Sequence, residues 1–292
     1  MERKIELDFE EFMQAQGKDQ AVSIIRDCYD HNEACSLHET FLDEYRVFMG
    51  VGGMLQVLNE FIATGDYNMV MALQKNIIDA YLADMAKYAG PSETVRIMSA
   101  FNSVPAQLAK ENRKFQYKII KSGARAFHYA SAIDWLVASA TVNKCTKVTE
   151  GRVPLTAFAE TGSFKIYMAD TGLLCASYGI SPVVFQRESE AWQSIKEALT
   201  ENYVASALTG NDYTPYYWES EGKAEVDFVI QTQSGEVIPV EVKSSDNVRS
   251  KSLQQFISKY TPSWSMRISA KNFGFENNIK SVPHYAVFCV TA

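Results

Sequence analysis

Residues 224–243 read AEVDFVIQTQSGEVIPVEVK, and this stretch decides how the C-terminal part of the chain folds. Apolar and polar residues alternate on either side of Gln233-Ser234-Gly235, which is the pattern of two half-buried strands joined by a short turn. A three-residue loop with Gly235 in the left-handed region closes such a pair as a bulged turn. The sequence therefore predicts an antiparallel β-hairpin.

The turn also fixes which residues of the two strands lie opposite one another. With Gly235 closing the loop, Asp227 lies opposite Glu241 and Glu225 lies opposite Lys243, so the four polar side chains share one face. The apolar residues then share the other face, which we expect a helix to cover. These residues are Val226, Phe228, Ile230, Ile238, Val240 and Val242.

The polar face gathers carboxylates that repel one another unless another charge neutralises them. Like charges about 4 Å apart cost roughly 1 kcal/mol in water and more when partly buried. A hard divalent cation, Mg²⁺ or Mn²⁺, would supply that charge, with Asp227, Glu241 and the backbone carbonyl of Val242 as a partial shell. Lys243 is placed to position or deprotonate a metal-bound water that attacks a phosphodiester, and Glu201 on the preceding helix is the expected fourth group.

Two other interpretations of the same face remain open. Alternating Glu-Val-Lys is common on exposed strands, so Glu225 and Lys243 are also consistent with an ordinary cross-strand pair on a solvated surface. A nuclease-like site can also be catalytically silent and serve to bind DNA or a protein partner. The net charge of -7 favours that second interpretation.

The N-terminal part of the sequence is predicted to be helical. Apolar residues recur three and four positions apart over residues 9–89, with a break at Gly52-Gly53. Gly90-Pro91 ends this region, and Ser92 is the expected N-cap of the helix that follows. We therefore place a module boundary at residue 91.

The next part has the order of a winged helix–turn–helix. Helical patterns occupy residues 93–100, 104–111 and 126–140, and the polar segment 146–166 suits the two strands of a wing. Basic residues gather here, which favours DNA binding, although a helical connector with solvated lysines would have the same composition. The candidate DNA contacts are Lys114, Lys118, Lys121, Arg125, Lys144 and Lys147.

From residue 189 onward the pattern mixes helices and strands. We expect helices at residues 190–208 and 249–260 around the hairpin, and strands near residues 264–270 and 285–290. The aromatic cluster Tyr213, Tyr216, Tyr217 and Trp218 is interpreted as a strand beside the hairpin with its rings packed on the sheet, and base stacking is the alternative.

Several classes of protein are excluded or disfavoured. No apolar run is long enough to span a bilayer and the start lacks a signal region, so we expect a cytoplasmic protein without a membrane partner. Scattered cysteines argue against a disulfide framework or a zinc ribbon. Four potential zinc ligands on one helix cannot converge, which leaves only a two-ligand site completed by a partner chain. They are Cys28, His31, Cys35 and His38.

Taken together, several motifs resemble the domain-of-unknown-function family that forms the C-terminal end of many bacterial and archaeal AAA-type ATPases. The resemblance implies a winged helix followed by a PD-(D/E)XK nuclease-like fold, with Glu201, Asp227, Glu241 and Lys243 at the matching positions. Leu55 stands where the family usually has proline, so the loop after Gly53 is expected to differ. The motifs lie at residues 7–12, 52–54, 81–88, 104–109, 132–136, 165–174, 201–204, 225–228 and 241–243.

The sequence thus predicts a multi-domain chain of α and α/β modules. Residues 1–91 form a helical region after an absent ATPase core, residues 92–186 a winged-helix module, and residues 187–292 a PD-(D/E)XK restriction-endonuclease-like α/β domain. No GxxxxGK[ST] motif occurs, so we expect no ATP site and no ATP hydrolysis by this chain. A truncated ATPase and a gene without its motor both fit, and DNA, a protein partner or self-association are the expected contacts.

Overall fold

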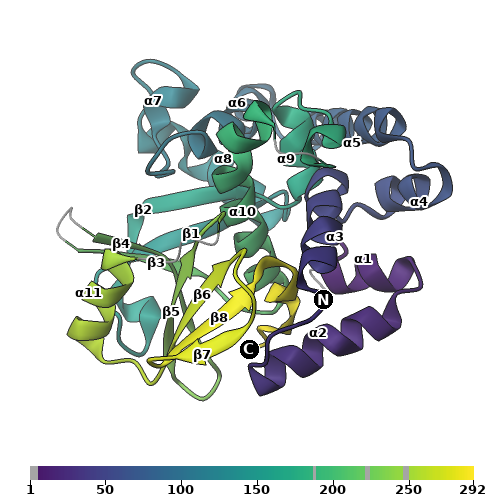
Figure 1. The fold of residues 1–292 in the computed structure, drawn as a ribbon. Helices are drawn as coiled ribbons and strands as arrows, with labels where there is room; N and C mark the ends of the chain where they lie inside the picture. Colours follow the sequence, from purple (N-terminus) through teal and green to yellow (C-terminus); the bar gives the residue numbers. More distant parts are fainter. Residues whose placement is uncertain (1–5, 187–188, 221–223, 246–249) are drawn as a thin grey trace.

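A computed structural model describes residues 6–186, 189–220, 224–245 and 250–292 (Figure 1). The N-terminal half is mainly helical, as expected for residues 9–89, and its helices pack beside a mixed sheet formed by the rest of the chain. The helices of this half are α1 (Phe9–Ala15), α2 (Asp19–His31), α3 (His38–Val51), α4 (Leu55–Thr64), α5 (Tyr67–Tyr88), α6 (Pro91–Leu108), α7 (Tyr117–Ile120) and α8 (Ala126–Ala138).

Local capping and glycine geometry explain where the first helices begin and end. Asp8 caps α1 in a reciprocal capping box with Glu11. The end of α3 is set by Gly52, whose φ of 76° is the left-handed conformation that glycine adopts most easily. Gly53 follows in close contact with the N-terminal segment, because a Cβ there would lie 2.0 Å from the carbonyl oxygen of Leu7.

Two sequence predictions in the next segment are wrong in detail. The patterns at residues 93–100 and 104–111 form one continuous helix, α6, which accommodates Pro105 one turn before its C-terminal end. The N-cap of α6 is Gly90 and not Ser92, because Pro91 takes the first helical position, where its missing N–H costs nothing. The pattern at residues 126–140 corresponds to α8.

The strands form a single mixed sheet in the order β2-β1-β3-β4-β5-β6-β8-β7 among the described residues. Two antiparallel strands, β1 and β2, form in the segment predicted as a wing, but they belong to the large sheet because β1 also pairs in parallel with β3. The strands are β1 (Val142–Val148), β2 (Ala159–Met168), β3 (Tyr216–Ser220), β4 (Ala224–Gln231), β5 (Val237–Val242), β6 (Ser265–Ser269), β7 (Gly274–Glu276) and β8 (Ile279–Pro283).

The predicted hairpin is confirmed, and its register holds for residues 228–231 opposite residues 237–240. Phe228 pairs with Val240 and Ile230 with Ile238, as the predicted register requires, whereas Asp227 and Glu241 lie just beyond the paired residues. Gly235 closes the loop with a φ of 85°, and its N–H donates to the carbonyl of Thr232. The strand predicted for the aromatic cluster is confirmed as β3, which contains Tyr216, Tyr217 and Trp218.

The apolar face of the hairpin is not continuous as the alternation predicted. The register between β3 and β4 shifts between the pairs Trp218–Val226 and Tyr216–Val229, which inserts an extra residue into β4. Val226 therefore packs with Val229 in a second core cluster, whereas Phe228, Ile230, Ile238, Val240 and Val242 belong to the main core. A strict period of two could not anticipate a bulge.

Helices α10 (Glu190–Gly210) and α11 (Lys251–Tyr260) cover the two faces of this sheet. Apolar residues of α10 pack in the main core with Phe228 and Ile230, and Phe256 of α11 packs against Trp218 and Val226 in the second cluster. Both helices were expected, and the predicted start of the second at residue 249 lies outside the described residues. Among the described residues, no helix has the length and apolar character needed to cross a membrane.

The predicted strand at residues 285–290 is wrong. The chain forms β8 just before it, and residues His284–Cys289 form a short 3-10 helix. Every residue of that helix is buried, so its apolar run lacks the alternation that separates a strand from a helical turn. The remaining helical segments are α9 (Thr171–Ser177) and two further 3-10 turns at Leu155–Phe158 and Pro182–Gln186.

Candidate functional site

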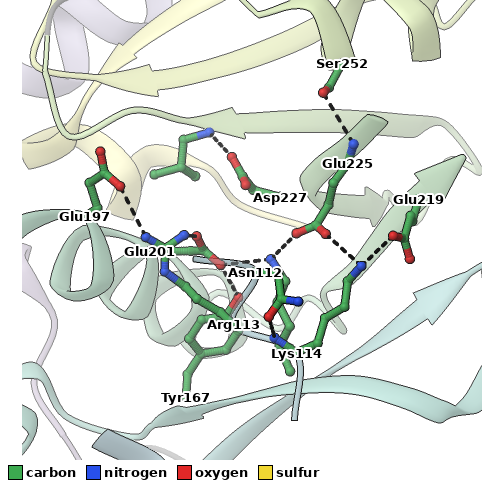
Figure 2. Close-up of polar contacts among 12 residues, drawn as sticks. Asn112, Arg113, Lys114, Tyr167, Glu197, Glu201, Glu219, Glu225, Asp227 and Ser252 are labelled. Atoms are coloured by element: carbon green, nitrogen blue, oxygen red, sulfur yellow. Dashed lines mark hydrogen bonds and ion pairs between the residues drawn. The ribbon is translucent and has the colours of Figure 1, made fainter. Parts of the chain in front are cut away.

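The candidate site lies where α10, β4 and the second half of β2 meet the segment between α6 and α7 (Figure 2). Glu201 comes from the middle of α10, and Glu225 and Asp227 come from β4. Glu241 ends β5 together with Val242, and Lys243 follows. Glu201 and Glu241 are each only 3% exposed, so the interpretation of this acidic set as solvated surface is wrong for both.

A buried lysine joins two of these carboxylates. Lys165 of β2 is 1% exposed, and its Nζ lies 3.0 Å from Oε1 of Glu201 and 2.7 Å from Oε1 of Glu225. Burial alone lowers the pKa of Lys165, but the two carboxylates outweigh it and raise the pKa above its usual value. Lys165 is therefore a permanent cation between α10 and β4.

Glu201 has two further partners. Arg113, in the segment between α6 and α7, places Nη1 2.6 Å from Oε2 of Glu201 and also approaches Glu197 at 3.5 Å. The hydroxyl of Tyr167 donates to Oε1 of Glu201 at 2.6 Å. Burial raises the pKa of Glu201, but the charges of Lys165 and Arg113 and the Tyr167 hydrogen bond outweigh it and hold the pKa below its usual value.

Glu225 does not pair with Lys243, the partner that the sequence predicted for it. Its second partner is Lys114, whose Nζ lies 3.4 Å from Oε2 of Glu225 and also contacts Glu219. Lys243 pairs with its own neighbour on the strand, because its Nζ lies 2.7 Å from Oε1 of Glu241. The predicted set is therefore divided into a group around Lys165 and a Glu241–Lys243 pair.

Asp227 lies between these two groups. Its Oδ2 accepts a hydrogen bond of 2.8 Å from the backbone N–H of Val242. Burial raises the pKa of Asp227 to about 8, with further contributions from the nearby carboxylates of Glu201 and Glu241. Asp227 therefore keeps its proton to a higher pH than an ordinary aspartate.

The residues present fit a divalent cation only in part. Within the described ranges, no group of three or more His, Cys, Asp or Glu side chains is arranged to hold a metal ion. The Oε2 atom of Glu241 is nevertheless buried without a hydrogen-bond partner in the described part of the chain. Asp227 and Glu241 therefore make a pair of carboxylates of the kind that binds Mg²⁺ together with water. The carboxylate of Glu201 is instead bound by Arg113, Lys165 and Tyr167.

The structure separates the six predicted DNA contacts into two groups. Lys147 pairs with Glu160 at 2.9 Å, and Lys144 lies 4.7 Å from the ring centre of Phe164. With Lys114 bound to Glu219 and Glu225, these three lysines contribute to the fold. The other three are exposed in and after α7: Lys118, Lys121 and Arg125.

The four candidate zinc ligands do not share one helix, because Cys28 and His31 belong to α2 and His38 to α3. His38 bonds through one ring nitrogen to the hydroxyl of Tyr285 and through the other to the carbonyl of Ala270. The cysteines are free thiols. These contacts leave His38 no ring nitrogen for a metal.

Sequence reasoning missed the cations that neutralise the site. Arg113 and Lys165 lie far from the hairpin in the sequence, and no spacing rule connects them with it. One signal was available, because Lys165 interrupts the apolar run of residues 164–168. A lysine inside a buried strand needs a carboxylate partner.

Two family models match the chain. Residues 42–183 match a domain of unknown function (DUF8612), and residues 196–286 match a second domain of unknown function (DUF4143). DUF4143 is commonly associated with AAA-type ATPases, which confirms the expected resemblance at that level. No curated protein and no solved structure matches the chain.

The buried position of Lys165 predicts a large effect of its removal. Lys165→Met keeps the length of the side chain but leaves Glu201 and Glu225 short of a cation, and we expect a loss of about 3–5 kcal/mol in the free energy of unfolding. Lys144→Met on the neighbouring strand serves as the control and should cost about 1 kcal/mol or less. Urea unfolding measures both, and equal losses in the two variants would contradict the assigned role.

The raised pKa of Asp227 predicts a pH-dependent stability. Asp227 stays protonated in the folded protein up to a pH of about 8, whereas an ordinary aspartate loses its proton near pH 3.8. Protonated Asp227 therefore contributes its full stabilisation below pH 3.8, and this contribution is lost as the pH rises from 3.8 to about 8. Asp227→Asn cannot ionise and can still accept from Val242. We expect it to be more stable than the wild type at about pH 9, with a smaller difference at about pH 5.

Urea unfolding at both pH values measures this difference. Asp84→Asn on the exposed surface of α5 is the matched control, and it should leave the pH dependence unchanged. A difference between wild type and Asp227→Asn that is the same at both pH values would contradict the raised pKa.

Proposed function

We propose that this chain is a nuclease-like module that binds DNA, is catalytically silent in the arrangement described, and works with an AAA-type ATPase. The observation that carries the proposal is that the carboxylate of Glu201 is already bound by Arg113, Lys165 and Tyr167. The match to DUF4143 supports the association with an ATPase. The hairpin, with helices on both faces of its sheet, supports the nuclease-like fold.

The proposed lack of nuclease activity follows from the positive charges around the carboxylates. Metal-dependent hydrolysis of a phosphodiester needs carboxylate oxygens that face a cation and its waters. The protein already supplies Glu201 with two cationic side chains and a hydroxyl donor. A metal at Glu201 would have to displace Arg113 or lie within reach of two positive charges, and both carry a cost of several kcal/mol when partly buried.

DNA binding is supported by a basic surface that the fold leaves free. Lys118, Lys121 and Arg125 are exposed, and next to them Phe127 is 93% exposed at the start of α8. We call these four residues the α7–α8 surface. Cations beside an exposed aromatic ring are a combination that binds phosphates and stacks on unpaired bases. Because the chain as a whole is acidic, this local surface determines where a polyanion approaches.

A Mg²⁺-dependent nuclease is the second candidate, and one observation favours it. The unpartnered Oε2 of Glu241 and the raised pKa of Asp227 both indicate a local excess of negative charge. A bound Mg²⁺ would supply Lewis acidity there. Asp227 and Glu241 would hold the ion, and Lys243 would hold a water or a phosphate oxygen by its ammonium group.

The DNA proposal predicts a specific response to charge removal. In the triple variant Lys118→Gln, Lys121→Gln and Arg125→Gln, we expect affinity for a DNA duplex with a single-stranded end to fall by about tenfold or more at physiological salt. The slope of log affinity against log salt should fall by roughly 3, one unit for each lost phosphate contact. Fluorescence anisotropy at several salt concentrations measures both quantities.

The matched control removes the same net charge elsewhere. It carries Lys75→Gln, Lys251→Gln and Lys271→Gln, which are exposed positions outside the α7–α8 surface. Equal weakening by the two triple variants would mean that net charge alone matters. No binding by the wild type would leave a protein partner or self-association as the function of the module.

The two candidates differ in a plasmid cleavage assay with Mg²⁺ or Mn²⁺. The silent module predicts no metal-dependent nicking by the wild type and no change in Asp227→Ala or Lys243→Ala. Nicking that requires the metal and disappears in both variants would establish the second candidate instead. Circular dichroism of each variant checks that the fold persists.

A further inference from the structure

A cavity of about 510 Å³ lies away from the Lys165 group, between the N-terminal segment, α3, β1, α9 and the second half of α10. Its volume is within the range of small-molecule sites and is far larger than a metal ion needs. The charged residues in its wall are mostly acidic: Glu6, Asp8, Asp170 and Asp212, against Lys144 alone among the described residues. The lining therefore favours a cation.

Glu6 is the acidic residue whose bonding is incomplete. Its Oε1 atom is buried and has no hydrogen-bond partner among the described residues. Burial raises the pKa of Glu6 to about 8, and the nearby charge of Asp170 contributes to the shift. Asp170 differs, because the backbone N–H groups of Gly53 and Leu173 donate to it at 2.6 and 2.8 Å. Asp170 is thus a structural cap on α9, whereas Glu6 remains available to a ligand.

A second unpartnered polar group lines the same cavity. Tyr203 of α10 is 4% exposed, and its hydroxyl has no hydrogen-bond partner in the described part of the chain. Its ring is held by edge contacts with Tyr45 and Phe48, with centroids 5.1 and 5.9 Å apart. A buried hydroxyl without a partner costs about 1–3 kcal/mol. The cavity wall thus contains two buried oxygen atoms that can accept hydrogen bonds, one on the N-terminal segment and one on α10.

We propose that this cavity binds a small organic cation with a primary ammonium group and a hydrocarbon body. The ammonium donates to Glu6 and Tyr203, and its charge offsets the acidic lining. The hydrocarbon body lies against the apolar part of the wall, which includes Phe48, Val137 and Val142. Diamines of moderate length have this chemistry.

Other ligand classes fit less well. An anion would face the acidic residues of the wall with Lys144 as the one described cation to bind it. A metal ion alone lacks a site, since no group of three or more metal-ligating side chains was found in the described ranges. A neutral polyol of the same length could hydrogen-bond to Tyr203 but carries no charge to stabilise the ionised form of Glu6, so it serves as the control ligand.

Isothermal titration calorimetry of the full chain with 1,5-diaminopentane and with 1,5-pentanediol tests the proposal. We expect the diamine to bind with a dissociation constant on the order of 100 µM, and the diol to bind at least about tenfold more weakly. Glu6→Gln should weaken diamine binding by about tenfold or more, and Tyr203→Phe by about fivefold. Asp84→Asn, an exposed acid on α5, should leave it unchanged.

Each outcome decides for or against the proposal. Equal binding of diamine and diol, no diamine binding, or diamine binding that survives both substitutions would overturn it. Circular dichroism and urea unfolding establish that the variants are folded, and Tyr203→Phe preserves the ring packing if Glu6→Gln disturbs the N-terminal segment. Loss of diamine binding in Asp84→Asn as well would indicate nonspecific attraction to negative charge and would also overturn the proposal.

Discussion

The ion pairs of Lys165 are the constraint on which the rest of the structure depends. A lysine that is 1% exposed must keep its carboxylates, so β2, α10 and β4 are held together at the contacts of Lys165 with Glu201 and Glu225. Lys165 lies in the region matched by DUF8612, and both carboxylates lie in the region matched by DUF4143. The parallel pairing of β1 with β3 joins the same two regions in one sheet. The two matched regions therefore share a sheet and a buried ionic contact.

The parts of the fold that the sequence predicted are those set by local chemistry. The hairpin register followed from Gly235 and from alternation over a few residues on either side, and long helices such as α10 followed from their periodicity. The errors arose where tertiary contacts decide. The extra residue in β4 moved Val226 into another core cluster, and residues 284–289 are buried on all sides, so no periodicity separates a strand from a 3-10 helix.

The acids of the candidate site and Lys243 were predictable from the sequence, whereas the cations that neutralise Glu201 were not. Glu201, Asp227, Glu241 and Lys243 were identified because the hairpin and the helix before it place them within one region of the fold. The partners of Glu201 come from two other places in the chain, and only the tertiary fold brings them to it. Whether a carboxylate cluster binds a metal or is neutralised by the protein is therefore decided by long-range contacts that spacing does not reveal.

The segment between α6 and α7, which contains Arg113, also leads into the surface proposed to bind DNA. Arg113 has a φ of 48°, a conformation that costs a non-glycine residue energy unless its contacts hold it there, and its ion pair with Glu201 is such a contact. Helix α7 and the α7–α8 surface begin a few residues later. A polyanion bound to this surface can break the Arg113–Glu201 ion pair only if it binds more tightly to the form in which the pair is broken. A ligand shifts a conformational equilibrium only by the difference in its affinity for the two forms. The free-energy cost of leaving the buried Glu201 without Arg113 sets how large this difference in affinity must be.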